Sequence, residues 1–307
     1  MAVDNIPTFS VYQNAISGFN TLQTALSKVQ TQVSTGNIAQ NFSDLDGSLS
    51  QSLSAETLVA SSNSYTTGNN FVITNVQAYA SVLQQLQSID TQLQSALATQ
   101  RSAAGPTNPL TQTATSLLQT VQGLLNTQSS SGQYIFSGSR TQTPPVYGIT
   151  TTTNLVNNIP TANYYQGDNA TLSLEASAGV TVQYGIKAND PTFQNLIGAL
   201  NMAIEGANNG SDTTLASAVN LANQAGNQLS SMVAANGDTL TQLQNANDNN
   251  ASDVTYLQQV LGNLDDTNIP AASVQVSEDQ TTLQASYQIF ADESKDSLVN
   301  FLTSIGA

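Results

Sequence analysis

Long stretches of this chain carry apolar residues three or four positions apart, and this spacing constrains the fold more than any other feature. Such spacing places the side chains on one stripe of an α-helix. A helix cannot bury a narrow stripe alone, so each stretch needs a partner helix in the same chain or in another copy. We therefore expect a mainly helical protein.

The two ends of the chain carry the stripes that we expect to pack between copies. Both lie at free ends, and their polar faces hold few charges that would keep neighbours apart. The first is expected to end near Gly36 and the second to begin at a cap, Asn268 or Thr267, with Pro270 in its first turn. The residues assigned to this assembly interface are Phe9, Tyr12, Ile16, Phe19, Leu22, Leu26, Val29, Val33, Leu283, Tyr287, Phe290, Leu298, Phe301 and Ile305.

The inner stripes are expected to form a core within one chain. They run over residues 72–97, 114–125, 193–204 and 215–264. The last of these, if continuous, would extend about 75 Å at 1.5 Å per residue. Pro191 is well placed at a helix start, with Asp190 or Asn189 as the cap. Polar interruptions are expected at residues 67–71, 208–212 and 235–240.

The middle of the chain has a different period. Between Tyr147 and Lys187 apolar and polar residues alternate, as in the segments 172–176 and 180–186. Alternation with β-branched and aromatic residues predicts short antiparallel strands.

The predicted fold is mainly α with a small β insertion (α+β). It is an elongated antiparallel helical bundle or coiled coil built from both chain ends, with a short antiparallel β domain in the middle of the chain. The expected parts are an N-terminal assembly helix (1–40), two halves of a helical body (41–138 and 191–266), a β domain (139–190) and a C-terminal assembly helix (267–307).

The segment "GQYIFSGSRTQTPPV", residues 132–146, lies where the helical period ends. We expect its two aromatic residues to anchor the helical body and its Pro-Pro pair to redirect the chain. Its arginine is expected to brace the loop by hydrogen bonds rather than to act in catalysis. This predicted boundary motif consists of Tyr134, Phe136, Gly138, Arg140, Pro144 and Pro145.

Composition argues against several classes of function. The formal charge is −15 with only five basic residues, which disfavours binding to nucleic acid and to anionic membrane surfaces. The chain has no histidine and no cysteine, so it has neither a Ser-His-Asp triad nor a thiolate zinc site. We expect no enzyme, no cofactor and no metal site. The first residues form no cleavable secretory signal, and no stretch is long and apolar enough for membrane insertion.

Several motifs resemble those of the bacterial flagellin superfamily. "LQASYQIFADESKDSLVNFL" (283–302) resembles the ends of bacterial flagellins and hook-associated proteins. The boundary motif, with "YYQGDNATLSL" (164–174), is similar to segments of the type 3 hook-associated proteins of this superfamily, which form the hook–filament junction. "LSKVQTQVSTGN" (26–37) and "DDTNIPAASVQVS" (265–277) resemble two further family segments.

The resemblance implies a structural role in the flagellum. Family members leave the cell unfolded through the flagellar type III apparatus, without a cleaved signal, and pair their terminal helices as a coiled coil. It implies these partners: further copies in a ring or layer, a neighbouring hook-associated protein on the hook side, flagellin on the filament side and an export chaperone. A flagellin that forms the filament is the alternative, and a helical surface adhesin is a remote one.

Overall fold

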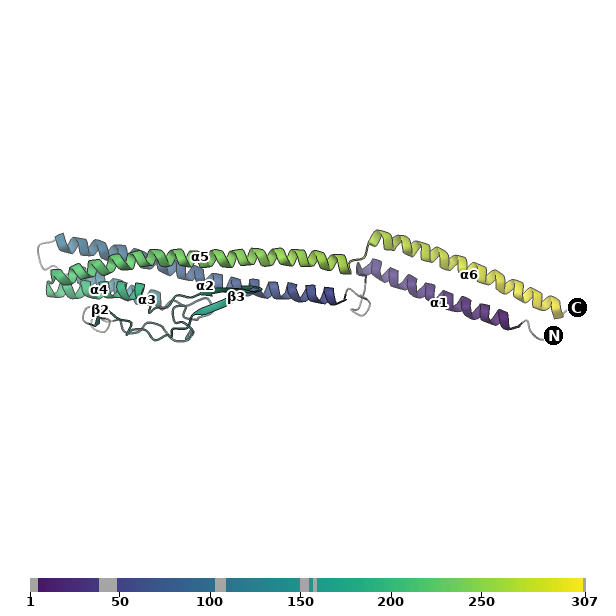
Figure 1. Cartoon of the computed structure of the whole chain (residues 1–307), viewed down its shortest axis with the longest axis horizontal. Helices are drawn as coiled ribbons and strands as arrows, with labels where there is room; N and C mark the ends of the chain where they lie inside the picture. Colours follow the sequence, from purple (N-terminus) through teal and green to yellow (C-terminus); the bar gives the residue numbers. More distant parts are fainter. Residues whose placement is uncertain (1–4, 39–48, 103–108, 150–154, 157–158, 306–307) are drawn as a thin grey trace. The chain divides into compact units, whose positions relative to one another are not determined.

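The structure is a computed structural model that describes residues 5–38, 49–102, 109–149, 155–156 and 159–305. Figure 1 shows helices at both chain ends and short strands between them, in the order that the sequence predicts. The elements are α1 (Asn5–Thr35), α2 (Leu49–Ser102), α3 (Pro109–Leu125), β1 (Leu155–Val156), β2 (Ile159–Pro160), β3 (Leu172–Ser177), β4 (Val180–Tyr184), α4 (Pro191–Asn209), α5 (Asp212–Asp265) and α6 (Ile269–Ile305).

The chain divides into two compact units. The terminal unit comprises residues 1–59 and 255–307, and the central unit comprises residues 60–254. The division falls within α2 and α5, so each of these helices contributes residues to both units.

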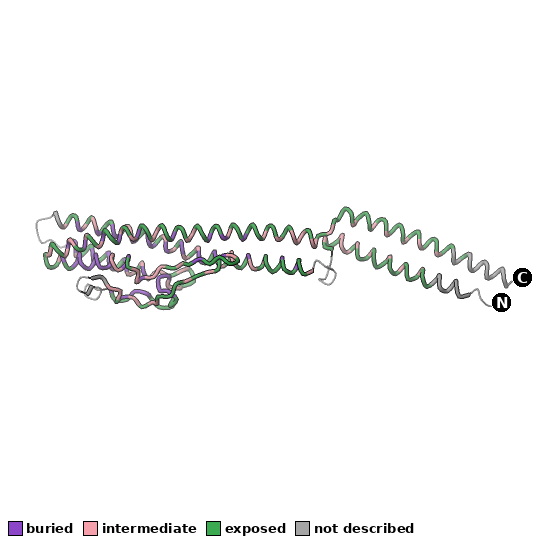
Figure 2. The backbone as a smooth tube through the Cα atoms, viewed as in Figure 1, coloured by how far each residue is buried: buried purple, intermediate pink, exposed green. Residues whose placement is uncertain are grey.

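The central unit contains a fully buried apolar core. The stripe of α2 packs with α3, α4 and α5, and Figure 2 shows buried residues along these helices. Leu83, Leu86, Leu93 and Leu97 of α2 are completely buried, as are Val121 of α3 and Leu229 of α5. The inner stripes therefore form a core within one chain, as the sequence predicts, except that the last one is fully buried only as far as Ala246 and its later residues Leu257 and Leu261 are half-buried.

The ends of α4 follow from local chemistry. Pro191 opens the helix, and the Asp190 carboxylate accepts a hydrogen bond of 2.9 Å from the Thr192 N–H. At the other end Gly210 takes a left-handed conformation, with φ of 62°, and its N–H donates to the Gly206 carbonyl. The predicted cap at Asp190 and the predicted interruption at residues 208–212 are both confirmed.

The strands form two antiparallel hairpins, β1–β2 and β3–β4. The β3–β4 hairpin lies on the side of α2 and α5, where Ala176 and Val182 pack against Val72, Val76 and Leu243. The register of β3 shifts at Ala176, between Glu175 and Ser177. The Ala176 carbonyl accepts hydrogen bonds of 2.9 Å from the side-chain amides of Asn69 and Asn250, so amide groups dock the hairpin onto both helices.

Two predicted interruptions are wrong. Helices α2 and α5 run without a break through residues 67–71 and 235–240. Asn69 is fully buried and holds the hairpin, and the Asn236 amide donates to the Val76 carbonyl at 2.9 Å. These amides have partners far away in the sequence, so their polarity does not end the helix.

Helix α2 also begins earlier than its predicted stripe, which starts at Val72. The reason is that its first turns bury small side chains, Ser52, Ala55 and Ser62, at helical spacing. Two of these are polar, so hydropathy alone gives no stripe there.

Candidate assembly surface

The two terminal helices pack against each other within the terminal unit. Figure 1 shows α1 and α6 side by side and running in opposite directions. The Phe19 ring of α1 stacks on Tyr287 of α6, with ring centroids 4.9 Å apart. The same ring meets Phe290 edge-on at 5.4 Å. Such aromatic pairs add specificity to the apolar contact of the two stripes.

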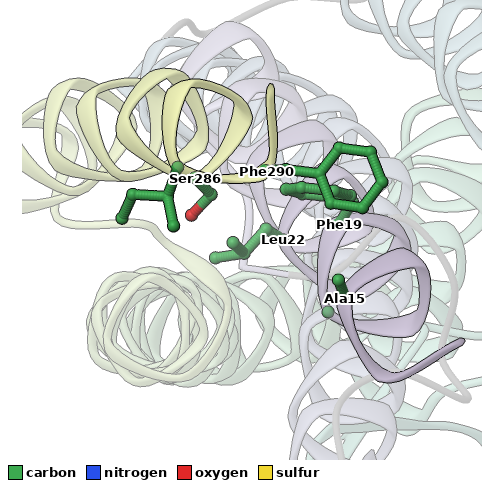
Figure 3. Close-up of a pocket in the computed structure, with 7 residues that line it drawn as sticks. Ala15, Phe19, Leu22, Ser286 and Phe290 are labelled. Atoms are coloured by element: carbon green, nitrogen blue, oxygen red, sulfur yellow. The ribbon is translucent and has the colours of Figure 1, made fainter. Parts of the chain in front are cut away.

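An apolar pocket of about 260 Å³ opens between these helices. Figure 3 shows Phe19 and Leu22 of α1 beside Phe290 and Ser286 of α6 around this pocket. Its full lining is Ala15, Gly18, Phe19, Leu22, Ser286, Ile289 and Phe290.

The pair does not complete a core of its own. Among the side chains that the structure describes in α1 and α6, none is fully buried, in contrast to the central unit. Ile16 is 45% exposed, Tyr287 is 49% exposed and Ile289 is 67% exposed. Exposed large apolar side chains on a helix pair are typical of a surface that another chain covers.

Of the described residues that the sequence assigns to the assembly interface, Phe19, Leu22, Tyr287 and Phe290 lie at the contact between α1 and α6. Leu22, Leu26, Val29, Val33 and Leu283 are half-buried. The side chains of five other assigned residues lie outside the described part of the chain: Phe9, Tyr12, Leu298, Phe301 and Ile305.

Sequence reasoning missed four residues of the pocket, namely Ala15, Gly18, Ser286 and Ile289. Ala15 and Gly18 lie three positions apart, so they share a helix face with Phe19 and Leu22. A small residue repeated at this spacing lets a neighbouring helix approach closely, and this signal is visible in the sequence.

Charges contribute little to the pairing of α1 and α6. Within the described residues one salt bridge is present, between Lys295 and Asp292 of α6, at 3.6 Å with both side chains largely exposed. Helix α1 carries a single cation, Lys28, and no acidic residue. Exposed ion pairs stabilise weakly, so apolar packing holds the pair.

In the boundary motif, Phe136 is an anchor as predicted. It is fully buried, and its ring meets Tyr79 at 5.1 Å and Phe193 at 5.9 Å. The Tyr79 hydroxyl donates to the Ile135 carbonyl at 2.5 Å. Tyr134, the second predicted anchor, is only half-buried, and its neighbour Ile135 occupies the buried place instead.

Asp168, rather than Arg140, braces this loop. Its carboxylate accepts hydrogen bonds from the Ser139 N–H at 2.9 Å and from the Ser139 hydroxyl. These bonds, with smaller contributions from the Ala170 N–H and the Arg140 charge, lower the pKa of Asp168. The Arg140 side chain is exposed and acts on Asp168 only through its charge.

Gly138 and the Pro-Pro pair shape the rest of the motif. Gly138 has φ of +68°, and a Cβ there would lie 2.7 Å from the Asp168 carbonyl oxygen, so only glycine fits. Pro144 is exposed, whereas Pro145 is buried and its carbonyl accepts from the Gln166 N–H at 2.9 Å. The chain thus turns into the β region after Pro145.

The described residues contain no cluster of three or more His, Cys, Asp or Glu side chains that could hold a metal ion. In the part of the chain that the structure describes, no helix combines the length and apolarity needed to cross a membrane.

Comparison with known families identifies the helical part of the chain. Residues 6–141 match the family described as the bacterial flagellin N-terminal helical region. Over these residues, which we call the flagellin-type region, the chain is similar to the N-terminal helical region of bacterial flagellins. The flagellin-type region spans α1, α2 and α3 and ends within the boundary motif. The resemblance to the flagellin superfamily is thereby confirmed.

Solved structures of flagellar proteins share the fold. A protein described as a flagellar hook-associated protein from Vibrio parahaemolyticus aligns with a TM-score of 0.59 and 14% identity, over 73% of this chain and 100% of its own. FlgL from Xanthomonas campestris gives 0.53 and 12%, over 68% and 99% of the two chains. FlgL from Bacillus cereus gives 0.50 and 14%, over 64% and 98%. No curated protein sequence matches the chain.

Proposed function

We propose that this protein is a structural subunit of the bacterial flagellum that forms the junction between hook and filament. The observation that carries the proposal is the α1–α6 pair, in which no described side chain is fully buried although the stripes continue along both helices. A pair of this kind gains stability when further copies cover it. The flagellin-type region and the shared fold supply the context.

In this proposal the terminal helices of neighbouring copies pack together into a ring or layer. The neighbours are a hook-associated protein on the hook side and flagellin on the filament side. The chain reaches this place by export in an unfolded form, with a chaperone holding it before secretion. No step needs catalysis, and no cofactor is involved.

A filament-forming flagellin is the second candidate, because flagellins share the terminal helices. The β3–β4 hairpin and the boundary motif favour the junction protein. The alignment with the hook-associated protein from Vibrio parahaemolyticus, which covers 73% of this chain and 100% of that protein, points the same way. A helical surface adhesin finds no support in these features.

The abundance of this protein in sheared flagella distinguishes the two candidates. A filament subunit makes up nearly all of the protein in sheared flagella, whereas a junction subunit occurs in one short layer and forms a trace band. We expect the trace band, measured by quantitative mass spectrometry against flagellin from the same preparation. An abundance equal to that of the main filament protein would contradict the junction assignment and favour the flagellin alternative.

A further inference from the structure

Two short segments of the terminal unit pair as an antiparallel bridge. One, residues 36–38, follows α1, and the other, residues 265–267, joins α5 to α6. The Ile38 N–H donates to the Asp265 carbonyl and the Thr267 N–H donates to the Gly36 carbonyl, each at 2.7 Å. We name these two segments the clasp.

Side chains and a glycine hold the clasp in place. The Gln32 amide donates to the Ile38 carbonyl at 2.6 Å, and the Ser52 hydroxyl of α2 donates to the Asp265 carboxylate at 3.0 Å. Gly36 has φ of +78° and ends α1 by donating to the Gln32 carbonyl at 2.8 Å. The clasp therefore fixes where α1 ends relative to the start of α6.

The spacing of the apolar stripes does not by itself specify the alignment of α1 and α6. An apolar stripe at heptad spacing is nearly unchanged after a slip of one heptad, so this spacing is compatible with several registers. Among the described residues no salt bridge joins α1 to α6, since the Lys295 ammonium pairs with Asp292 of its own helix, so ion pairing does not set the register.

The aromatic contact is consistent with an alignment set at the clasp. At 1.5 Å per residue, Phe19 lies roughly 25 Å from Gly36 along α1, and Tyr287 lies roughly 30 Å from Thr267 along α6. The two rings stack, and these two distances from the clasp agree to within about one helical turn.

We propose that the clasp is a register device, which aligns α1 with α6 so that every copy presents the same pocket and the same exposed side chains. The inference deepens the proposed function, since it says how the assembly surface is kept in one arrangement. The test measures the alignment of two helices within one copy. The proposal about the clasp can therefore fail while the flagellar role holds, and the flagellar role can fail while the clasp proposal holds.

Disulfide trapping in the full chain tests the proposal, because the natural sequence has no cysteine. Leu22 and Ser286 line the same pocket, so the pair Leu22→Cys and Ser286→Cys reports the observed register. The pair Leu22→Cys and Asp279→Cys reports a slip of one heptad. With the clasp intact, we expect the first pair to cross-link at least about tenfold faster, because a slip of about 10 Å exceeds the reach of a disulfide.

Proline at the clasp should abolish this preference. Thr267→Pro and Ile38→Pro each remove one N–H donor of the clasp, and we expect the two cysteine pairs then to cross-link at rates within about twofold. Thr267→Ala and Ile38→Ala keep the N–H groups and should retain the preference. Cross-linking is measured at low protein concentration, so that only products within one chain are scored.

Two results would overturn the proposal. The first is a preference that persists in both proline variants, which would mean that the stripes fix the register unaided. The second is equal cross-linking of both pairs with the clasp intact.

Discussion

Asp90 of α2 is a buried carboxylate that lacks a charged partner among the described residues. It is 3% exposed and faces Gly226 of α5. One carboxylate oxygen accepts from the Gln94 amide at 2.7 Å, and the other has no hydrogen-bond partner. Burial raises the pKa of Asp90 to about 6, and the Gln94 bond opposes this only in part.

The substitution Asp90→Asn should stabilise the protein at neutral and alkaline pH. Because the pKa is raised in the folded state, the folded chain binds the proton more tightly than the unfolded chain. Its contribution to stability is present below about pH 4 and is lost as the pH rises through about 6. We expect the variant to unfold at a temperature several degrees higher at pH 8 and to show little difference at pH 4.

Thermal unfolding followed by circular dichroism between pH 4 and pH 8 checks this prediction. Asp248→Asn serves as the control, because Asp248 lies exposed on α5 and should leave the profile unchanged. A pH profile of Asp90→Asn that runs parallel to that of the original chain would contradict the role assigned to Asp90.

The elements of the fold differ in how far the sequence predicts them. The end of α1 at Gly36, the cap at Asp190 and the cap at Asn268 follow from local chemistry, and all three are observed. The polar segments 67–71 of α2 and 235–240 of α5 predict interruptions, which are absent because their buried amides have partners far away in the sequence. Asn69 donates to the Ala176 carbonyl of the hairpin, and Asn236 donates to the Val76 carbonyl of α2.

The candidate assembly surface is likewise predicted from the sequence only in part. Periodicity predicts the stripe with Phe19, Leu22, Tyr287 and Phe290, since each stripe lies on one helix. The pocket between the helices depends on their alignment, which no pattern on a single helix specifies. In the boundary motif the brace came from Asp168, a residue beyond the loop, for the same reason.

The continuity of α5 predicts opposite effects for two glycines. A Cβ at Gly237 meets nothing within 4 Å, so Gly237→Ala should stabilise α5 by about 0.5–1 kcal/mol. A Cβ at Gly226 would lie 2.5 Å from the Asp90 carboxylate, so Gly226→Ala should destabilise the protein.

Urea unfolding of both variants beside the original chain measures these differences. The two substitutions are chemically identical and lie in one helix, so each controls for the other. A loss of stability in Gly237→Ala would indicate that α5 breaks at residues 235–240 after all.

Removal of the C-terminal stripe should separate assembly from folding. A chain that lacks residues 283–307 loses Tyr287 and Phe290, the α6 partners of Phe19. We expect it to form no rings or layers, because the assembly surface is gone. The β3–β4 hairpin should remain folded, because its packing partners lie in the central unit.

Negative-stain electron microscopy detects assembly, and hydrogen exchange of residues 172–184 reports the hairpin. Rings or filaments formed by the truncated chain would show that α6 is dispensable for assembly. The substitution Asp248→Asn, at an exposed polar side chain of the central unit, provides a full-length control.

At the scale of the whole molecule, the two units differ in how completely they bury their apolar side chains. The central unit buries its apolar side chains fully and is expected to be stable alone. The terminal unit leaves the side chains of α1 and α6 partly exposed, and further copies would cover them. A stable body with an incompletely buried pair of terminal helices suits a subunit whose terminal helices are covered on assembly.

Deletion of the gene, followed by electron microscopy of the cells, tests the proposed function most directly. The junction role predicts hooks without filaments and flagellin released into the medium, because flagellin has no layer on which to polymerise. Expression of the original chain from a plasmid should restore the filaments. Normal filaments on the deletion strain would contradict the junction role.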